Sequence, residues 1–401
     1  EHTLNPAYYL LLTRPKVKVQ QELIHRTTRI RTTTVMFDRI YVAATSQHVG
    51  KTTSTLGIVA AIRNQGYNVG YCKPLGQEFV DLGELKVDKD ALLFARTMNF
   101  ELSAEKHSPV ILGRGVTTSF LRNPGDYSFP ERVTAASKIL QEEYDIVVYE
   151  GTGHPGVGSV IDLSNAAVAK MLNASVIMIV EGGIGNTIDK LNVNLSLFRE
   201  QNVPIAGVII NKVLPDKSDK VAELVGGKLK QWGIPLLGVL PYDKTLANPI
   251  MEGVRMAIDG MVIVNGHKLD NTVENIASGS LIEKREFDDL QNLLLIVSHR
   301  RLESAIRSLQ EIDRQHPDQD LKLAGIVVNG ENDFMSELQR EIPCQDYITF
   351  HEIPLIATQL DTYGSALKIS RMEVKINTRT PWKARRAVEL IKDYVNLEGL
   401  F

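Results

Sequence analysis

Cysteine is scarce in this 401-residue chain, since only Cys72 and Cys344 occur and they lie far apart. Two distant cysteines cannot form the disulfide framework of a small secreted domain, and such usage is typical of a reducing compartment. Long hydrophobic runs are also missing, because none approaches the roughly 18 residues that a membrane-spanning helix needs. We therefore expect a cytoplasmic protein with no membrane partner.

A surplus of charge of either sign is lacking as well. The 45 lysines and arginines stand against 48 aspartates and glutamates, which gives a formal net charge of −3. Nucleic-acid-binding proteins usually carry a basic surplus, so we expect no nucleic-acid partner. The composition, 43% hydrophobic and 23% charged, is that of a globular protein long enough for two domains. We also expect a homo-oligomer, in the simplest case a dimer.

Residues 1–35 differ from the rest, because they contain few acids and many arginines, lysines and threonines. Such an extension is typical of an organellar transit remnant, which would place the protein in an organelle matrix or stroma. The alternative is a non-functional extension before a misjudged start, because the first predicted strand follows directly after Met36. We expect the fold to begin at Met36.

From Met36 onward, predicted strands alternate with predicted helices. Near-continuous runs of Val, Ile and Leu predict buried strands at residues 39–44, 68–75, 144–150, 175–183, 205–213 and 235–243. Helical spacing of apolar residues is clearest at 52–65 and 131–143. Buried strands separated by helices predict an α/β fold, in which helices cover both faces of a parallel sheet.

A shift in composition near residues 245–285 predicts a domain boundary, after which a second α/β pattern begins. Its predicted strands are 260–266, 292–298, 322–330, 353–358 and 372–377, and its predicted helices are 301–314, 333–341 and 382–395. We therefore predict a first domain at 36–245 and a smaller α/β domain at 246–401.

The stretch ATSQHVGKTT (44–53) resembles a phosphate-binding loop, but it lacks the first glycine of the G-x-x-x-x-G-K-[ST] pattern because Thr45 stands there. It lies between a predicted strand and a predicted helix, so backbone N–H groups would open onto a helix N-terminus that attracts anions. Lys51 would act on the β- and γ-phosphates, and Thr52 would offer its hydroxyl to Mg²⁺. The alternative is a helix capped by Thr45 or Ser46 with a solvated lysine. The residues expected to contact the nucleotide here are Gln47, His48, Val49, Gly50, Lys51, Thr52 and Thr53.

Charged residues follow two other predicted elements at the same end of the sheet. Lys73 leaves a buried strand, from which it could hold an anionic substrate as a catalytic residue or simply be a solvated strand-end lysine. Asp88 and Asp90 begin a helix, where both could be capping residues only. Alternatively, the pair could give Mg²⁺ one carboxylate, which we assign to Asp90.

Glu150 ends a near-continuous apolar strand and is followed by the glycine-rich loop GTGHPGVG (151–158). An acid after a buried strand, opposite a phosphate loop, can complete the coordination of Mg²⁺. The glycines allow the backbone to approach a substrate closely. We interpret His154 as polar lining of this loop, because no metal-site spacing accompanies it.

Asn211 ends another predicted strand, and its amide offers one donor and one acceptor to the edge of a purine base. The stretch NKVL lacks the aspartate of an N-K-x-D guanine signature, so we expect ATP as the nucleotide. Pro241 and Tyr242 would close the same pocket from the next strand.

Together these residues resemble the dethiobiotin synthetase family and its relatives, the cobyrinic and cobyric acid synthases and the N-terminal domain of long phosphotransacetylases. The resemblance covers residues 37–245 and rests on the loop at 44–52, on Lys73-Pro74, on Asp90-Ala91, on Glu150-Gly-Thr-Gly and on the A-G-x-x-x-N stretch that ends at Asn211. It implies a P-loop NTPase-type sheet in which the loop lysine and threonine, the aspartate and the glutamate hold MgATP.

Residues 245–400 resemble the second, so-called DRTGG, domain of phosphotransacetylases, mainly through the stretch at 361–395. The D-R-T-G-G signature is absent, and IVSHRRLES (296–304) stands in its place. No phosphotransacetylase catalytic domain follows in this sequence, so acetyl transfer to phosphate is not expected.

The substrate end departs from the family pattern. Gln77 stands where dethiobiotin synthetases have a serine that contacts the carbamate, and the loop after Glu150 is longer. Both departures argue against diaminopelargonate as the substrate. Cys344 lacks a glycine-rich nucleophile turn, so no glutaminase is expected.

Two functions remain open from the sequence. The first is an ATP-dependent synthase or ligase with an anionic small-molecule substrate, in which Lys51 and Lys73 help to form an acyl phosphate. The second is a nucleotide-binding regulator whose C-terminal domain binds a ligand or partner. A partitioning ATPase is disfavoured, because Ser46 stands where its extra signature lysine would be.

Overall fold

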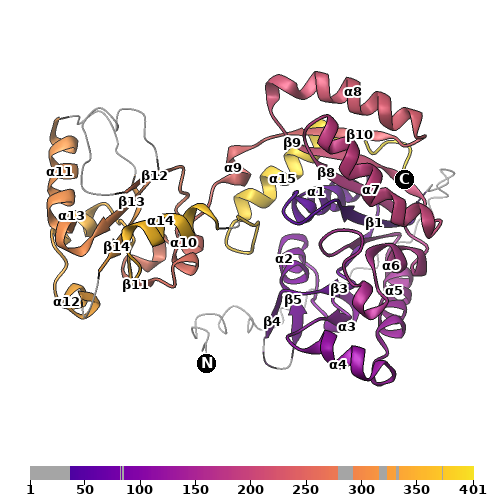
Figure 1. Ribbon diagram of the computed structural model, residues 1–401, viewed down its shortest axis with the longest axis horizontal. Coiled ribbons are helices and arrows are strands. Elements are labelled where there is room, and N and C mark those ends of the chain that lie inside the picture. The colour runs from indigo at the N-terminus through magenta and orange to yellow at the C-terminus, as the bar shows by residue number, and fades with distance from the viewer. Residues whose placement is uncertain are drawn as a thin grey trace, which may run out of the picture. The chain divides into compact units, whose positions relative to one another are not determined.

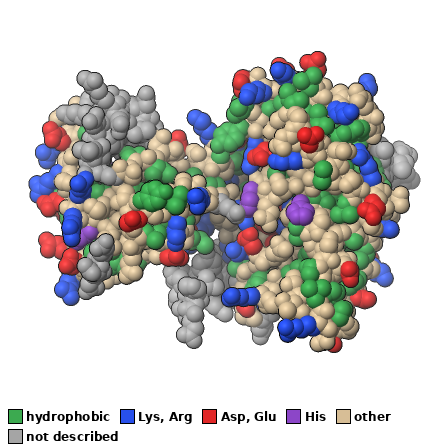
Figure 2. All heavy atoms as spheres, in the orientation of Figure 1, with side chains coloured by type: hydrophobic (Ala, Val, Ile, Leu, Met, Phe, Trp, Pro, Cys, Tyr) green, Lys and Arg blue, Asp and Glu red, His purple; other side chains and the backbone are tan. Residues whose placement is uncertain are grey.

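The computed structural model describes residues 37–401 except 82, 84, 279–291, 316–322, 331–333 and 373. The extension predicted at 1–35 lies outside the described residues. None of the helices in the described part of the chain is both long and apolar enough to cross a membrane. On the face shown in Figure 2, the coloured basic and acidic side chains are interspersed, as the near balance of charge suggests.

A six-stranded parallel sheet forms the first half of the molecule, with strand order β10-β9-β8-β1-β7-β2 (Figure 1). Its strands are β1 (Arg39–Ala44), β2 (Val69–Cys72), β7 (Ile146–Glu150), β8 (Ser175–Glu181), β9 (Ile205–Val213) and β10 (Leu236–Pro241). The chain starts at β1, builds one side of the sheet through β2 and β7, and then builds the other side from β8. A crevice for a ligand is expected where the direction of building reverses, at the carboxyl ends of β1 and its neighbours.

Helices cover both faces of this sheet, so the predicted fold class is confirmed. One continuous core joins the sheet to α5 (Phe129–Glu143), α6 (Asn165–Met171), α7 (Gly185–Glu200) and α8 (Ser218–Gln231). Tyr41 and Ala43 of β1 belong to that core, whereas Ile40 and Val42 alternate with them and are buried on the opposite face. The helix α1 (Lys51–Asn64) contacts β1, β2 and β7.

The chain between β2 and α5 contributes short elements that the sequence analysis did not predict. They are β3 (Leu75–Gly76), β4 (Phe79–Asp81), β5 (Lys86–Asp88), α3 (Ala104–His107), β6 (Val110–Ile111) and α4 (Val116–Arg122). β4 pairs with β5 on the path from β2 to the helix α2 (Lys89–Met98), and β3 pairs with β6, which follows α2 in the chain. This region therefore places α2 beside the first sheet.

A five-stranded sheet with order β11-β15-β14-β13-β12 forms the smaller second α/β unit, as predicted. Its strands are β11 (Met261–Val264), β12 (Asn275–Ser278), β13 (Leu293–Ser298), β14 (Leu323–Asn329) and β15 (Leu355–Thr358), of which only β11 runs antiparallel to its neighbour. One face packs against α11 (Leu302–Gln315), α12 (Phe334–Arg340) and α13 (Gln345–Phe350), and the other against α10 (Met251–Ala257) and α14 (Thr362–Ser370).

The strand predicted at 372–377 is wrong, because the described residues of this stretch form no strand. The alternating pattern imitates a strand, but the chain instead enters a turn that precedes α15. Asn377 N–H donates to Thr380 Oγ1 at 3.0 Å, and Arg379 N–H donates to Asn377 Oδ1 at 2.8 Å.

The last helix, α15 (Pro381–Tyr394), packs against α1 of the first sheet although it follows the second sheet in the chain (Figure 1). It also contacts β10 and α9 (Lys244–Ala247), and Gly238 bridges Val395. A Cβ atom at Gly57 of α1 would lie 2.3 Å from Ile391 Cγ1 and 2.8 Å from Ala387 O. The two helices therefore meet at a contact that only glycine permits. The predicted division of the chain at residue 245 stays a prediction.

From this close contact we predict opposite effects of two glycine-to-alanine variants on the free energy of unfolding. Gly57→Ala should lower the free energy of unfolding by about 1–3 kcal/mol, because the added methyl group forces α15 away from α1. Gly227→Ala is the matched control, since Gly227 is exposed in α8 and a Cβ atom added there would meet no described atom within 4 Å. It should raise stability by up to about 1 kcal/mol through helix propensity alone. Urea unfolding measures both values, and equal effects in the two variants would contradict the tight contact.

Candidate functional site

The loop between β1 and α1 has the backbone of an anion site. Gly50 has φ of 93° and His48 has φ of 61°, so both lie in the left-handed region. A Cβ atom at Gly50 would lie 2.2 Å from Asn211 Nδ2, which excludes any other residue there without movement. Gly50 itself precedes α1, and no side chain caps the helix. The alternative of a helix capped by Thr45 or Ser46 is therefore wrong, and in the described part of the chain no side chain caps the first N–H groups of α1.

Two groups in this loop fit a phosphate. Thr45 is 6% exposed, and within the described residues its Oγ1 has no hydrogen-bond partner. Lys51 Nζ donates a hydrogen bond to Gly153 O at 3.2 Å. Within the described residues, Lys51 forms no ion pair with a carboxylate. Desolvation by the surrounding protein, together with the nearby Lys73 ammonium, lowers the pKa of Lys51 to about 8. A phosphate oxygen would partner both groups.

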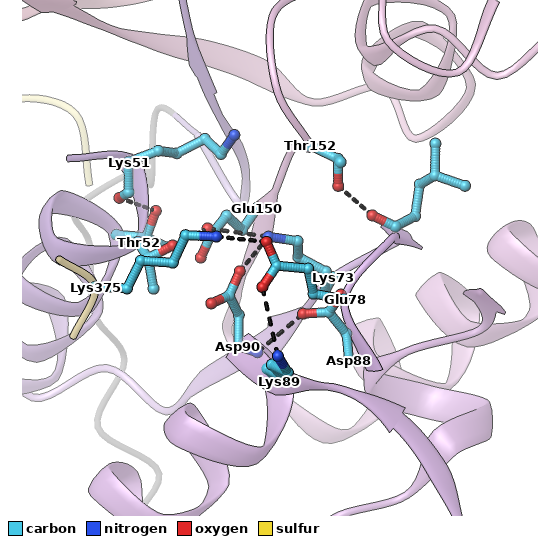
Figure 3. Close-up of polar contacts among 12 residues, drawn as sticks. Lys51, Thr52, Lys73, Glu78, Asp88, Lys89, Asp90, Glu150, Thr152 and Lys375 are labelled. Atoms are coloured by element: carbon cyan, nitrogen blue, oxygen red, sulfur yellow. Dashed lines mark hydrogen bonds and ion pairs between the residues drawn. The ribbon is translucent and has the colours of Figure 1, made fainter. Parts of the chain in front are cut away.

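Below the loop, Lys73 lies between two carboxylates (Figure 3). Its Nζ forms ion pairs with Asp90 and, at 3.2 Å, with Glu150 Oε1. The Lys73 side chain is only 6% exposed, so the alternative of a solvated strand-end lysine is wrong. Glu150 is fully buried and also accepts hydrogen bonds from Thr52 Oγ1 at 2.7 Å and from Tyr71 OH at 3.2 Å. Four elements, α1, β2, α2 and β7, thus meet at one carboxylate cluster.

Burial and charge act in opposite directions on this cluster. Burial alone would raise the pKa of Asp90, but the Lys73 ammonium holds it below its usual range. Burial raises the pKa of Glu150, although Lys73 opposes that shift. Burial would lower the pKa of Lys73, but Asp90 and Glu150 raise it well above its ordinary value. Lys73 is therefore a permanent cation in this site.

Asp88 and Asp90 have different surroundings although both begin α2. Asp88 Oδ1 accepts a hydrogen bond from Asp90 N at 2.9 Å and so caps the helix. Burial raises the pKa of Asp88 to about 6. The carboxylate of Asp90 instead turns to Lys73. Asp88 is therefore a capping residue, as one alternative predicted, whereas capping does not explain the ion pair of Asp90 with Lys73.

The donor set at the cluster fits Mg²⁺. Among the described residues, no group of three or more His, Cys, Asp or Glu side chains could hold a metal ion. Mg²⁺ does not need such a cage, because proteins usually bind it through one or two carboxylates together with substrate phosphates. Here Asp90 and Glu150 already share one cation, the Lys73 ammonium, and Thr52 is hydrogen-bonded to Glu150.

Asn211 lies against the phosphate loop. Its Nδ2 donates to Val49 O at 2.8 Å, and its Oδ1 accepts from Lys212 N at 2.8 Å. One N–H and one lone pair of the amide are left for a base. Lys212, which the sequence analysis missed, donates from Nζ to His48 O at 2.7 Å. Both residues at the end of β9 thus support the loop.

The other predicted nucleotide contacts vary in exposure. Gln47 and His48 are exposed, Val49 is buried, and Thr53 is half-buried at the start of α1. Pro241 ends β10 and pairs with Val213 of β9. The roles of these residues toward a nucleotide stay predictions.

The glycine-rich loop after Glu150 is held by Asn165, another residue that the sequence analysis missed. Asn165 Oδ1 accepts from Tyr41 OH at 2.7 Å and from Thr152 N at 2.9 Å. Its Nδ2 donates to the carbonyls of Thr152 and His154 at 2.8 and 2.6 Å. Its only signal in the sequence was a position in the stretch SNAAV that begins a helix. This network fixes the loop whose Gly153 carbonyl meets Lys51.

Three curated proteins illustrate what the chain is similar to. The phosphate acetyltransferase of Nitrosomonas europaea is 23% identical over 378 residues, which cover 90% of this chain and 51% of that protein. The probable cobyric acid synthase of Methanocaldococcus jannaschii is 26% identical over 243 residues, 53% of this chain and 47% of that protein. The ATP-dependent dethiobiotin synthetase of Clostridium kluyveri is 26% identical over 228 residues, 54% of this chain and 91% of that protein. The chain spans about half the length of the first two.

The expected relationship to these protein groups is confirmed. The site and the comparisons together support a P-loop ATP-binding domain. Residues 38–250, which are more than half of the chain, match the family model described as an AAA domain (AAA_26), and the protein therefore belongs to that family.

Proposed function

We propose that the protein is an MgATP-dependent synthase or ligase that activates a carboxylate or carbamate as an acyl phosphate. The observation that carries this proposal is the buried cluster in which Lys73 joins Asp90 and Glu150 beside the phosphate loop. If the ion pair with Lys73 had only a structural role, Glu150 would not also need to accept a hydrogen bond from Thr52 of the phosphate loop. Two of the similar proteins are a synthetase and a probable synthase, which supports the same reaction class.

The residues at the loop bind the nucleotide in this proposal. The N–H groups that open onto α1 and the Lys51 ammonium hold the phosphates, and Asn211 meets the adenine edge. The remaining nucleotide contacts are Gln47, His48, Val49, Gly50, Thr52, Thr53 and Pro241. Thr52, Asp90 and Glu150 hold Mg²⁺, which supplies positive charge to the phosphate oxygens.

Phosphoryl transfer then needs little covalent chemistry from the protein. An oxygen of the acceptor carboxylate attacks the γ-phosphorus, the bond from that phosphorus to the β-phosphate oxygen breaks, and ADP leaves. A second nucleophile attacks the carbonyl carbon of the acyl phosphate and releases phosphate. Lys51 stabilises negative charge on the transferred group, and Lys73 positions the acceptor.

A nucleotide-binding regulator is the second candidate, and one observation favours it. Helix α15 lies between the second sheet and the chain end and packs directly on α1, the helix that begins at the phosphate loop. The second unit, which we propose to be DRTGG-like, could therefore respond to nucleotide through α15. Variants of residues 296–304 would uncouple such a response from nucleotide binding.

Nucleotide choice is the first prediction for this site. ATP should bind at least about tenfold more tightly than GTP, because the free donor and acceptor of Asn211 match adenine and two hydrogen bonds together contribute about 2 kcal/mol. Isothermal titration calorimetry with both nucleotides and Mg²⁺ measures the ratio. Equal affinities would remove Asn211 from base recognition.

Glu150→Gln is predicted to lower MgATP turnover on the order of 10²-fold, because it removes a charge beside the transferring phosphate. Glu181→Gln is the matched control, since Glu181 also ends a strand of the same sheet but is 44% exposed and pairs with Lys212. That control should keep most of its activity. Steady-state release of ADP measures both variants, and unchanged nucleotide affinity and hydrolysis in Glu150→Gln would exclude the acid from the site.

Lys73→Ala separates the two candidate functions. In a synthase it should change MgATP affinity by only a few-fold while abolishing ADP release that depends on the acceptor, because Lys73 positions that acceptor. Thermal unfolding in the presence of MgATP verifies that the variant folds, since removal of a buried ion-pair partner destabilises a protein. The acceptor is sought by adding pools of cellular metabolites to the wild type. If no metabolite stimulates ADP release, the regulator replaces the synthase.

A further inference from the structure

An exposed lysine from the C-terminal part of the chain, Lys375, lies beside the carboxylate cluster (Figure 3). Lys375 Nζ forms an ion pair and hydrogen bond with Glu78, a residue 297 positions away in the sequence. Figure 3 shows the Lys375 side chain extending toward Glu78 beside Asp90. Lys375 therefore lies beside the site although no motif of the first sheet contains it.

The position of Lys375 is set by the helix that follows it. The Asn377–Thr380 turn begins two residues later, and Thr380 is only 1% exposed. The turn leads directly into α15, which is held against α1 by the close contact at Gly57. The segment that carries Lys375 is thus anchored to the helix that begins at the phosphate loop.

The ion pair between Lys375 and Glu78 is exchangeable. Their side chains are 44% and 53% exposed, and ion pairs so open to water contribute little to stability. Lys89 lies 3.7 Å from the other oxygen of Glu78, so two lysines share this one carboxylate. An anion from solution can therefore replace the Glu78 carboxylate on Lys375 without loss of the fold.

Lys73 is less able than Lys375 to bind a further anionic group of a ligand. Its side chain is 6% exposed, and it is already paired with two carboxylates, those of Asp90 and Glu150. The side chain of Lys375 is 44% exposed and can therefore be reached by a ligand from solution. The site thus presents a buried cation for the reacting group and an exposed cation farther out.

We propose that Lys375 is a substrate-binding residue, which holds a second anionic group of the acceptor in the place that the Glu78 carboxylate takes in this structure. The acceptor is then a dianion of the dicarboxylate class. This inference rests on the proposed function, and it makes the segment between the second sheet and α15 part of the acceptor site.

Chemical labelling tests the contact without an activity assay. The wild type is treated with an amine-selective acetylating reagent in MgATP, with and without succinate, glutarate or adipate, and lysine peptides are quantified by mass spectrometry. We expect at least one dicarboxylate to protect Lys375 severalfold and to leave Lys368 unchanged. Lys368 is the internal control, because it is 46% exposed and pairs with Asp259 at 3.5 Å. Equal labelling of Lys375 under all conditions overturns the inference.

Three variants give a second readout through ADP release stimulated by the protecting dicarboxylate. Lys375→Ala should raise its half-saturating concentration about tenfold or more with little change in kcat, and Lys368→Ala should leave both unchanged. Glu78→Gln should lower that concentration, because it removes the competing carboxylate. A purely structural pair would give the same direction of effect in Lys375→Ala and Glu78→Gln, which overturns the inference. Failure of the wild type to bind MgATP would instead overturn the proposed function, and the labelling result would still decide the role of Lys375.

Discussion

The Lys73 ammonium between Asp90 and Glu150 is the interaction on which the site depends. The two acids differ in exposure, since Glu150 is fully buried and the Asp90 side chain is 26% exposed, but each carboxylate disfavours the charge of the other. Burial raises the pKa of Glu150, and the Lys73 ammonium opposes that shift. The cation therefore favours the ionised form of both acids, and the P-loop threonine is hydrogen-bonded to the same Glu150.

The order of the strands brings these groups together. β1, which leads into the phosphate loop, lies between β7 and β8, and β7 in turn separates it from β2. Because all of these strands are parallel, Glu150 at the end of β7 and Lys73 after β2 reach the same edge of the sheet as the loop. The Asn165 network and the Asn211 amide then fix the two loops that border this edge, since both amides bond to backbone atoms of those loops.

The C-terminal segment connects this edge to the rest of the chain. Helix α15 packs on α1 through the contact at Gly57, and the segment before the Asn377–Thr380 turn carries Lys375, which lies beside the carboxylate cluster. A change in the second sheet that moved this segment would therefore shift a charge at the site directly. The contact between α15 and α1 is compatible with both candidate functions. In an enzyme, the segment that carries Lys375 would complete the acceptor site, and in a regulator it would transmit the response to nucleotide. The two functions differ in whether an acceptor stimulates release of ADP.

The sequence by itself determined the α/β fold of both sheets, the position of the phosphate loop between a strand and a helix, and the position of Glu150 at the end of a buried strand. Runs of Val, Ile and Leu report burial on both faces of a strand, and a glycine-lysine-threonine turn between a strand and a helix has few other uses. Only the tertiary structure decided the partners of Lys73, the different surroundings of Asp88 and Asp90, and the path of residues 374–401. The alternating pattern at 372–377 predicted a strand where the described residues form none. The physical reason is that local periodicity reports how deeply a segment is buried, whereas ion pairs and helix contacts depend on segments that are distant in the sequence.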